Sequence, residues 1–166
     1  LELIEKNKIA LKGPLTTPVG TGFRSINVGL RQKFNLFANV RPVISIPGVP
    51  SRFDHVDLVI FRENTQGLYS GLETYDPINE MADSVARITR HASENIVRAA
   101  CEHARTREFK KVTLAHKANI LKESQGLFLA TGQAVARNFP DIAFEDKIID
   151  NMAMQLVMKP EQFGVI

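Results

Sequence analysis

Short apolar segments alternate along this chain with segments whose apolar residues follow a helical period. Between positions 84 and 107 the apolar residues recur three and four apart, which predicts an amphipathic helix with a charged outer face. Residues 57–61 and 111–115 are short and apolar, as buried strands are. Alternation of this kind predicts an α/β fold, a sheet flanked by helices. The expected strands are residues 9–11, 36–46, 57–61, 111–115, 142–149 and 163–166; the expected helices are residues 1–6, 25–34, 84–107, 124–138 and 151–158; residues 63–83 are expected to be loop with short extended pieces.

Composition excludes several classes of protein. The 166 residues are 44% apolar and 23% charged, which is ordinary for a globular domain. A net charge of +3 does not require nucleic acid or an anionic membrane as a partner, and small acidic ligands are equally compatible with it. The single cysteine, Cys101, excludes an internal disulfide framework and favours a reducing compartment. No apolar run approaches the roughly 18 residues of a membrane span. We therefore expect a cytoplasmic protein.

Both ends of the sequence lie within expected elements. Residue 1 begins inside a helical pattern, and residues 163–166 look like the start of a buried strand. We expect a fragment of a longer polypeptide, with a chain that ends on an edge strand as the alternative.

Three arginines are candidate ligands for an anion. Arg31 lies in an expected helix, Arg41 lies in an expected strand, and Arg62 ends the apolar segment 58–61. Ligands of open α/β sheets bind at strand ends, and a guanidinium group binds a carboxylate through two parallel hydrogen bonds. A carboxylate-binding cluster is one interpretation, and separate structural ion pairs are the other.

Two further residues stand at strand ends. Lys117 follows the strand 111–115, where a desolvated lysine can serve as a base and a solvated one has no chemical role. Asp150 stands between an expected strand and an expected helix, as a helix N-cap or as a ligand of a hard metal.

The segment before the first long helix is rich in glycine and proline. Gly20 and Gly22 lack the third glycine of a dinucleotide-binding fingerprint, so we interpret this segment as a loop. Ser25 can cap the helix that follows, and a helix N-terminus attracts anions through its unpaired N–H groups.

Taken together, six segments resemble the β-decarboxylating dehydrogenases that oxidise isocitrate, isopropylmalate and homoisocitrate. They keep the family's order and cover essentially the whole chain. The resemblance implies the family's mixed sheet flanked by helices, with a smaller dimer-forming domain. It assigns residues 1–35 to the large domain and residues 36–166 mostly to the small, dimer-forming domain with its clasp segment. By the same resemblance we expect the start and the C-terminal remainder of the family fold to lie outside these 166 residues. The segments are residues 12–18 (KGPLTTP), 24–31 (RSINVGLR), 36–42 (LFANVRP), 61–71 (FRENTQGLYSG), 116–122 (HKANILK) and 149–155 (IDNMAMQ).

Within the family, Ser25 and Asn27 point to isocitrate as the substrate. The resemblance implies that this pair holds the γ-carboxylate of isocitrate, and a hydroxyl and an amide beside a helix N-terminus suit an anion. By the same resemblance the substrate's carboxylates are bound by Arg31, Arg41 and Arg62, and the cofactor by Thr17 and Asn119. Residues 36–42 and the short connection between residues 71 and 84 resemble the NAD-type members of the family, which implies NAD as the cofactor, with NADP possible.

The resemblance also implies the chemistry, oxidative decarboxylation of isocitrate to 2-oxoglutarate and CO2 as in the tricarboxylic acid cycle. Lys117 resembles the base that removes the hydroxyl proton, and Tyr69 resembles the acid that protonates C3. Asp150 resembles a ligand of the Mg²⁺ or Mn²⁺ ion. Lys117 and Asp150 would act in the neighbouring subunit's site, which implies a homodimer or higher oligomer with shared active sites. The fragment alone is expected to be inactive.

Three alternatives stay open. One is a non-catalytic regulatory subunit of a hetero-oligomeric isocitrate dehydrogenase, although all the residues above are retained. Another is a homoisocitrate or isopropylmalate dehydrogenase. The third, a basic nucleic-acid-binding module, rests only on the calculated pI of about 9.1 and an arginine-bearing helix, and we expect no nucleic-acid or membrane partner. For a eukaryotic source the mitochondrial matrix replaces the cytoplasm.

Overall fold

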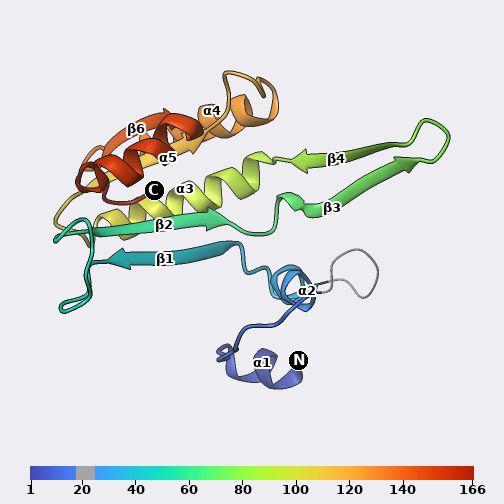
Figure 1. The fold of residues 1–166 in the computed structure, drawn as a ribbon, viewed down its shortest axis with the longest axis horizontal. Helices are drawn as coiled ribbons and strands as arrows, with labels where there is room; N and C mark the ends of the chain where they lie inside the picture. The colour runs from blue at the N-terminus through green and yellow to red at the C-terminus, as the bar shows by residue number, and fades with distance from the viewer. Residues whose placement is uncertain (18–24) are drawn as a thin grey trace.

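The computed structural model describes residues 1–17 and 25–166 and confirms an α/β architecture (Figure 1). Strands and helices alternate through most of the chain, as their apolar patterns predict. The helices are α1 (Glu2–Asn7), α2 (Ile26–Lys33), α3 (Arg90–Ala104), α4 (Ser124–Ala136) and α5 (Ile149–Met158), followed by the short helical turn η1 (Pro160–Gln162). The strands are β1 (Ala38–Ile44), β2 (Asp57–Glu63), β3 (Gly67–Asp76), β4 (Met81–Arg87), β5 (Lys111–His116) and β6 (Ala143–Ile148).

The main sheet is mixed and is completed by the last residues of the chain. β1 pairs antiparallel with β2, and β5 pairs parallel with β6. Residues 163–166, which we call the bridging segment, enter between β2 and β5. Val165 forms parallel bridges to both strands, and the Thr113 N–H donates to its carbonyl over 2.8 Å. The order across the sheet is therefore β1, β2, the bridging segment, β5 and β6. The expected buried strand at residues 163–166 is confirmed in part, because residues 163–165 are buried and Val165 alone forms the bridges.

The core lies between this sheet and the helices α3 and α4. The N-terminus of α3 is capped by Thr89, whose side-chain oxygen accepts a hydrogen bond from the Ala92 N–H over 3.3 Å. From this cap onward the apolar face of α3 turns inward, because its small and branched side chains repeat with the helical period. The buried cluster comprises Ile96, Val97, Ala100, Cys101, Ala104, Val112, Leu114, Val135, Phe139, Ile142 and Val165.

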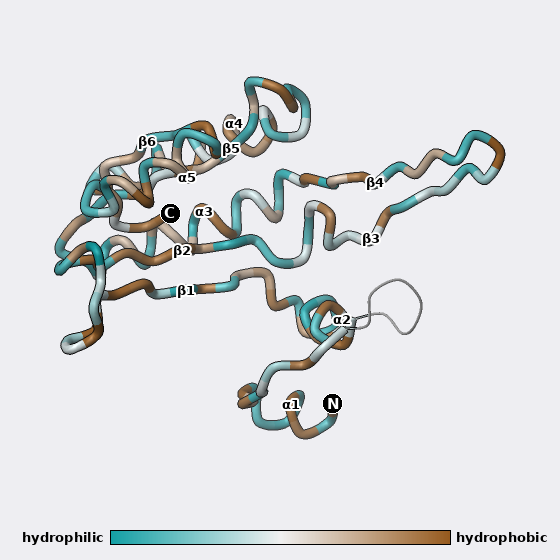
Figure 2. Tube along the Cα trace, viewed as in Figure 1, coloured by the Kyte–Doolittle hydropathy of each residue, from teal (hydrophilic) through white to brown (hydrophobic). Residues whose placement is uncertain are grey.

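β3 and β4 form a long hairpin that extends away from the core (Figure 1), where we predicted loop with short extended pieces over residues 63–83 and the first turn of a helix from residue 84. The prediction was wrong because Val85 fits a strand period as well as a helical one, and pairing with Leu72 places it in β4. Asp76 closes the turn by accepting hydrogen bonds from the Ile78 N–H and the Asn79 amide. Figure 2 shows hydrophobic residues along β1 and β2 and at the tip of this hairpin.

Two smaller expectations are also corrected. Residues 9–11 form no strand; they are exposed and irregular, and no strand of the described residues pairs with them. The expected strand at 36–46 is shorter, since β1 covers only Ala38–Ile44. Within the part of the chain that the structure describes, no helix has the length and apolarity that crossing a membrane requires.

Cys101 is expected to be unreactive in the native protein. Its side chain is fully buried in the core, and this burial raises the pKa of the thiol to about 11. Only about one thiol in a thousand is then ionised at pH 8, and the thiolate is the reactive form. Native protein incubated with Ellman's reagent at pH 8 should release almost no thionitrobenzoate, whereas one equivalent should appear in urea. Rapid stoichiometric release without urea would contradict the burial.

Candidate functional site

Arg31, Arg62 and Tyr69 meet in space from three different elements. The guanidinium carbons of Arg31 in α2 and Arg62 in β2 lie 5.5 and 5.4 Å from the centroid of the Tyr69 ring. Gln32 donates a hydrogen bond to the Tyr69 carbonyl over 3.2 Å and so ties α2 to β3. We call Arg31, Arg62 and Tyr69 the arginine–tyrosine cluster. Cation–π contacts hold the two positive groups beside one phenol.

Arg41 lies on the same face of the sheet as Arg62. The register pairs Asn39 of β1 with Arg62, and Arg41 follows Asn39 by two residues, so all three side chains project from one face. Each of these arginines is held by an amide: Arg41 donates to the Asn39 side chain over 3.1 Å, and Arg62 to the Asn64 side chain over 2.9 Å. An amide oxygen orients a guanidinium group without neutralising it.

The charges of this region are uncompensated. In residues 1–17 and 25–166, no carboxylate forms an ion pair with Arg31, Arg41 or Arg62. The Nε of Arg62 is buried and has no hydrogen-bond partner among those same residues. Separate structural ion pairs therefore do not account for these arginines, and an anionic ligand could satisfy them. The asparagine partners Asn39 and Asn64 were not among the predicted residues, although each stands two positions from its arginine in sequence.

Ser25 occupies the N-cap of α2, but its side chain does not cap the helix. Instead its hydroxyl accepts a hydrogen bond from the Thr17 hydroxyl over 3.1 Å, so these two predicted residues lie together. The N-cap position was predicted correctly, but the predicted side-chain cap is absent, because the Ser25 hydroxyl contacts Thr17 instead. Asn27 follows in the first turn of α2 and is partly buried. The glycine loop that contains Gly20 and Gly22 lies outside the described residues.

Lys117 and Asp150 form an ion pair. The parallel register of β5 and β6 pairs His116 with Ile148, so the residues that follow these two positions emerge at the same edge of the sheet. The N-cap of α5 is Ile148, and Asp150 lies in the first turn, which rules out the capping role considered for Asp150. The side chains of Lys117 and Asp150 are 30% and 69% exposed, so the pair is accessible to a ligand. Asn119 lies exposed in the turn after Lys117.

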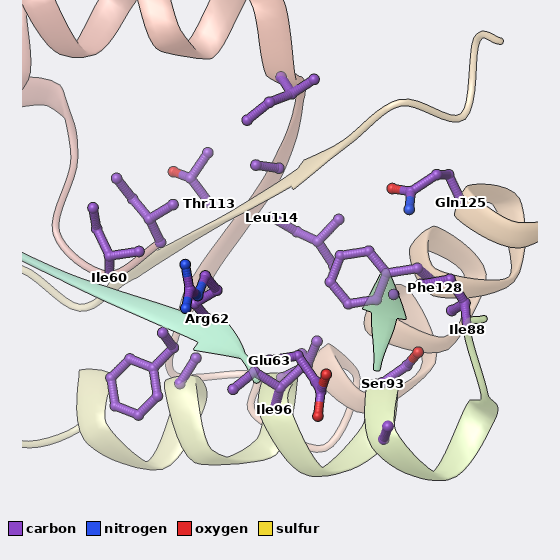
Figure 3. A pocket seen from close by; sticks show the side chains of 18 of the residues that line it. Ile60, Arg62, Glu63, Ile88, Ser93, Ile96, Thr113, Leu114, Gln125 and Phe128 are labelled. Atoms are coloured by element: carbon purple, nitrogen blue, oxygen red, sulfur yellow. The ribbon is translucent and has the colours of Figure 1, made fainter. Parts of the chain in front are cut away.

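The structure therefore assembles two groups. Of the arginine–tyrosine cluster, Arg62 lines a cavity of about 420 Å³, whose other lining residues are mostly apolar. Figure 3 shows Arg62 and Glu63 on one wall of this cavity and Gln125 and Phe128 of α4 on another. No hydrogen bond or ion pair of the described residues joins the cluster to the pair Lys117–Asp150. Gln125 was not predicted as a site residue, because an amide in an expected helix carries no signal of its own.

The acidic residues fit a divalent metal only in part. Among the residues that the structure describes, no group of three His, Cys, Asp or Glu side chains could hold a metal ion alone. Asp150 offers one hard oxygen donor of the kind that Mg²⁺ and Mn²⁺ prefer, and such ions need about six ligands. A metal site at Asp150 therefore needs donors from a substrate or from other parts of the protein.

Comparison with known proteins identifies the class. The model of the isocitrate/isopropylmalate dehydrogenase family matches residues 1–166, and the chain belongs to this family. Over 166 residues it is 49% identical to a regulatory subunit of the mitochondrial NAD isocitrate dehydrogenase of Dictyostelium discoideum, and 45% identical to catalytic subunit 5 of the mitochondrial enzyme of Arabidopsis thaliana. The crystal structure of isocitrate dehydrogenase from Methylococcus capsulatus superposes with a TM-score of 0.95 at 53% identity, over 99% of this chain.

The chain spans about half the length of these proteins. It covers 47% of the Dictyostelium protein, 44% of the Arabidopsis protein and 49% of the Methylococcus chain, while each match takes in all or nearly all of the present sequence. The family and the α/β fold follow directly from these comparisons. The activity of the whole protein is a separate question.

Proposed function

We propose that the protein containing this chain oxidatively decarboxylates isocitrate to 2-oxoglutarate and CO2 and reduces NAD. The observation that carries this proposal is the set of three arginines that have no ion-pair partner among the described residues, two of which lie beside Tyr69. Isocitrate has three carboxylates, and Arg31, Arg41 and Arg62 offer three guanidinium groups held by neutral partners. Ser25 and Asn27 at the start of α2 add a hydroxyl and an amide for the γ-carboxylate.

In the mechanism, the arginines bind and orient the substrate's carboxylates. Lys117 accepts the proton of the C2 hydroxyl, and Tyr69 donates a proton to C3 after CO2 has left. Asp150 would be one ligand of a divalent metal, and Thr17 and Asn119 would contact the cofactor. Bound NAD would supply a hydride acceptor, and bound Mg²⁺ or Mn²⁺ would supply Lewis-acid polarisation of a carbonyl oxygen.

The arrangement also supports an oligomer with shared sites. Lys117 and Asp150 lie at a sheet edge, and no hydrogen bond or ion pair among residues 1–17 and 25–166 joins them to the arginine–tyrosine cluster, so we propose that they complete the site of a neighbouring subunit. We propose a homodimer or higher oligomer on this basis. The Dictyostelium and Arabidopsis relatives are named as subunits, which supports assembly without specifying identical partners. The names of these two relatives are also mitochondrial, which supports the matrix for a eukaryotic source and favours it there over the cytoplasm.

A regulatory subunit is the second candidate, because the Dictyostelium relative bears that name. A regulatory subunit can bind isocitrate without turning it over. The presence of Tyr69, Lys117 and Asp150 together with all three arginines favours the catalytic role, since binding alone has no use for the base and the acid. The family description also includes isopropylmalate dehydrogenases, whose substrate would leave Ser25 and Asn27 without an anionic group to bind.

The full-length protein should reduce NAD with isocitrate and Mg²⁺, measured as absorbance of the reduced nicotinamide. We expect kcat/KM for isocitrate to exceed that for isopropylmalate by at least about 10², because replacing a carboxylate by an apolar group leaves buried polar groups unpaired. NADP serves as the parallel cofactor. Turnover of isopropylmalate alone would contradict the substrate assignment, and isocitrate binding without turnover would establish the regulatory alternative.

A further inference from the structure

His116 is buried directly beside the proposed base, yet no role has been assigned to its imidazole. Its side chain is only 6% exposed, and its Nε2 lies 3.0 Å from an oxygen of Asp146 on β6. Its Nδ1 lies 3.0 Å from the backbone nitrogen of Ala118. Because a backbone N–H can only donate, Nδ1 must accept and carries no proton. The ring proton therefore resides on Nε2, which donates to Asp146. Both ring nitrogens are used within the protein.

The backbone N–H and the backbone carbonyl of Lys117 both form hydrogen bonds. Its N–H donates to the side-chain oxygen of Gln125 in α4 over 3.3 Å. Its carbonyl accepts hydrogen bonds from the N–H groups of Ile120 and Leu121, over 3.1 and 2.9 Å. Every polar backbone group of Lys117 is thus bound within the described structure. The position of its Cα, and with it the origin of its flexible side chain, is fixed by β6, α4 and the following turn.

We propose that His116 and Gln125 are positioning residues that hold the turn at Lys117, so that its Nζ is presented in the geometry required of the base. The inference rests on the proposed function, because it assumes that Lys117 accepts the hydroxyl proton. Lysine has four rotatable side-chain bonds, so it needs a fixed backbone if its amine is to occupy one place. Proton transfer is sensitive to this placement, and an error of about 1 Å can lower a rate roughly 100-fold. Neither positioning residue touches substrate in this account.

The first test compares two substitutions of His116 in the full-length protein. His116→Leu removes both ring hydrogen bonds. His116→Asn places an amide oxygen where Nδ1 lies, so it keeps the acceptor for the Ala118 N–H and loses only the contact with Asp146. We expect His116→Leu to lower kcat about 30- to 100-fold with less than a threefold change in the KM for isocitrate. We expect His116→Asn to recover kcat to within about fivefold of the wild type.

The second test uses α4, so that it does not depend on the folding of the His116 variants. Gln125→Met removes the acceptor for the Lys117 N–H while keeping side-chain length, and we expect a loss of about tenfold in kcat with KM again nearly unchanged. Gln133→Met is the matched control, because Gln133 lies exposed on the same helix. Amide hydrogen exchange of residues 117–121, measured by mass spectrometry, should accelerate at least tenfold in His116→Leu and in Gln125→Met, and remain unchanged in Gln133→Met.

The outcomes separate this inference from the proposed function. If the wild-type protein does not turn over isocitrate, the proposed function is wrong. The positioning of a base is then wrong as well, even if slow amide hydrogen exchange shows that the turn at Lys117 is rigid. If the wild type is active and both His116→Leu and Gln125→Met keep kcat within threefold, the positioning role is overturned while the function stands. A His116→Asn variant that folds as well as His116→Leu and is equally slow would also overturn it, because the retained acceptor would then have no effect.

Discussion

Replacing Lys117 by methionine in the full-length protein is expected to lower kcat for isocitrate about 10²- to 10⁴-fold. Methionine keeps an unbranched side chain of similar length but removes the amine, and loss of a positioned acid or base costs this much. Because the Lys117–Asp150 ion pair also disappears, the concentration of Mg²⁺ needed for half-maximal activity is expected to change as well. Steady-state kinetics at saturating isocitrate measure both effects.

Lys110→Met is the control for this experiment. Lys110 lies just before β5, at the strand's opposite end, and has no place in the proposed machinery. The same change of charge and shape there should leave kcat within about twofold. Partial recovery of Lys117→Ala by added ethylamine would identify the missing group as the amine itself. If Lys117→Met kept wild-type kcat, another residue would have to be the base, while the substrate assignment through the arginines would be untouched.

Replacing Val165 by aspartate is expected to produce the largest loss of stability. Val165 is fully buried and belongs to the main core cluster, where it bridges β2 and β5. An aspartate there would bury a carboxylate with no partner, at a cost of roughly 3–5 kcal/mol in the free energy of unfolding. Urea unfolding of the full-length protein, followed by far-UV circular dichroism, should show a matching fall in the midpoint.

Val49→Asp makes the same chemical change in a different environment. Val49 lies in the turn between β1 and β2, where its side chain is 58% exposed. We expect its effect on the free energy of unfolding to stay within about 0.5 kcal/mol. Equal effects of the two substitutions would mean that the bridging segment is not packed between the two strands as the structure has it.

The fold was largely predictable because its core elements have distinct apolar periods. The core contains β2, β5 and α3 from Thr89 onward, and each of them buries one face or both. A buried face requires apolar residues at regular intervals, and this spacing can be seen in the sequence. The hairpin of β3 and β4 was missed for the opposite reason. The two strands are largely exposed and pair mainly with each other, so no apolar face marks them in the sequence. The spacing of Val85 and Ile88 also matches a helical period, which led to the prediction of a helix there.

The sequence indicates the residues of the candidate site one at a time, but it does not indicate how they lie relative to one another. The positions of Arg62, Lys117 and Asp150 at strand ends were visible in the sequence. Their partners were not, because the sequence alone does not give the register that places Asn39 opposite Arg62, or His116 opposite Ile148. The hydroxyl contact between Thr17 and Ser25 joins residues eight positions apart, a separation that no helical or strand period indicates. The roles assigned to these residues remain predictions that the variants above will test.

The position of the bridging segment has a consequence for synthesis on the ribosome. Val59 and Val165 lie side by side in the sheet but about 100 residues apart in the chain. At roughly 5–20 residues per second, β2 leaves the ribosome about 5–20 seconds before the segment that pairs with it. During this interval β2 and β5 cannot join through their shared neighbour, and each presents an unpaired edge. The nascent chain is then open to pairing with other chains, and a chaperone that covers these edges would raise the yield of folded protein.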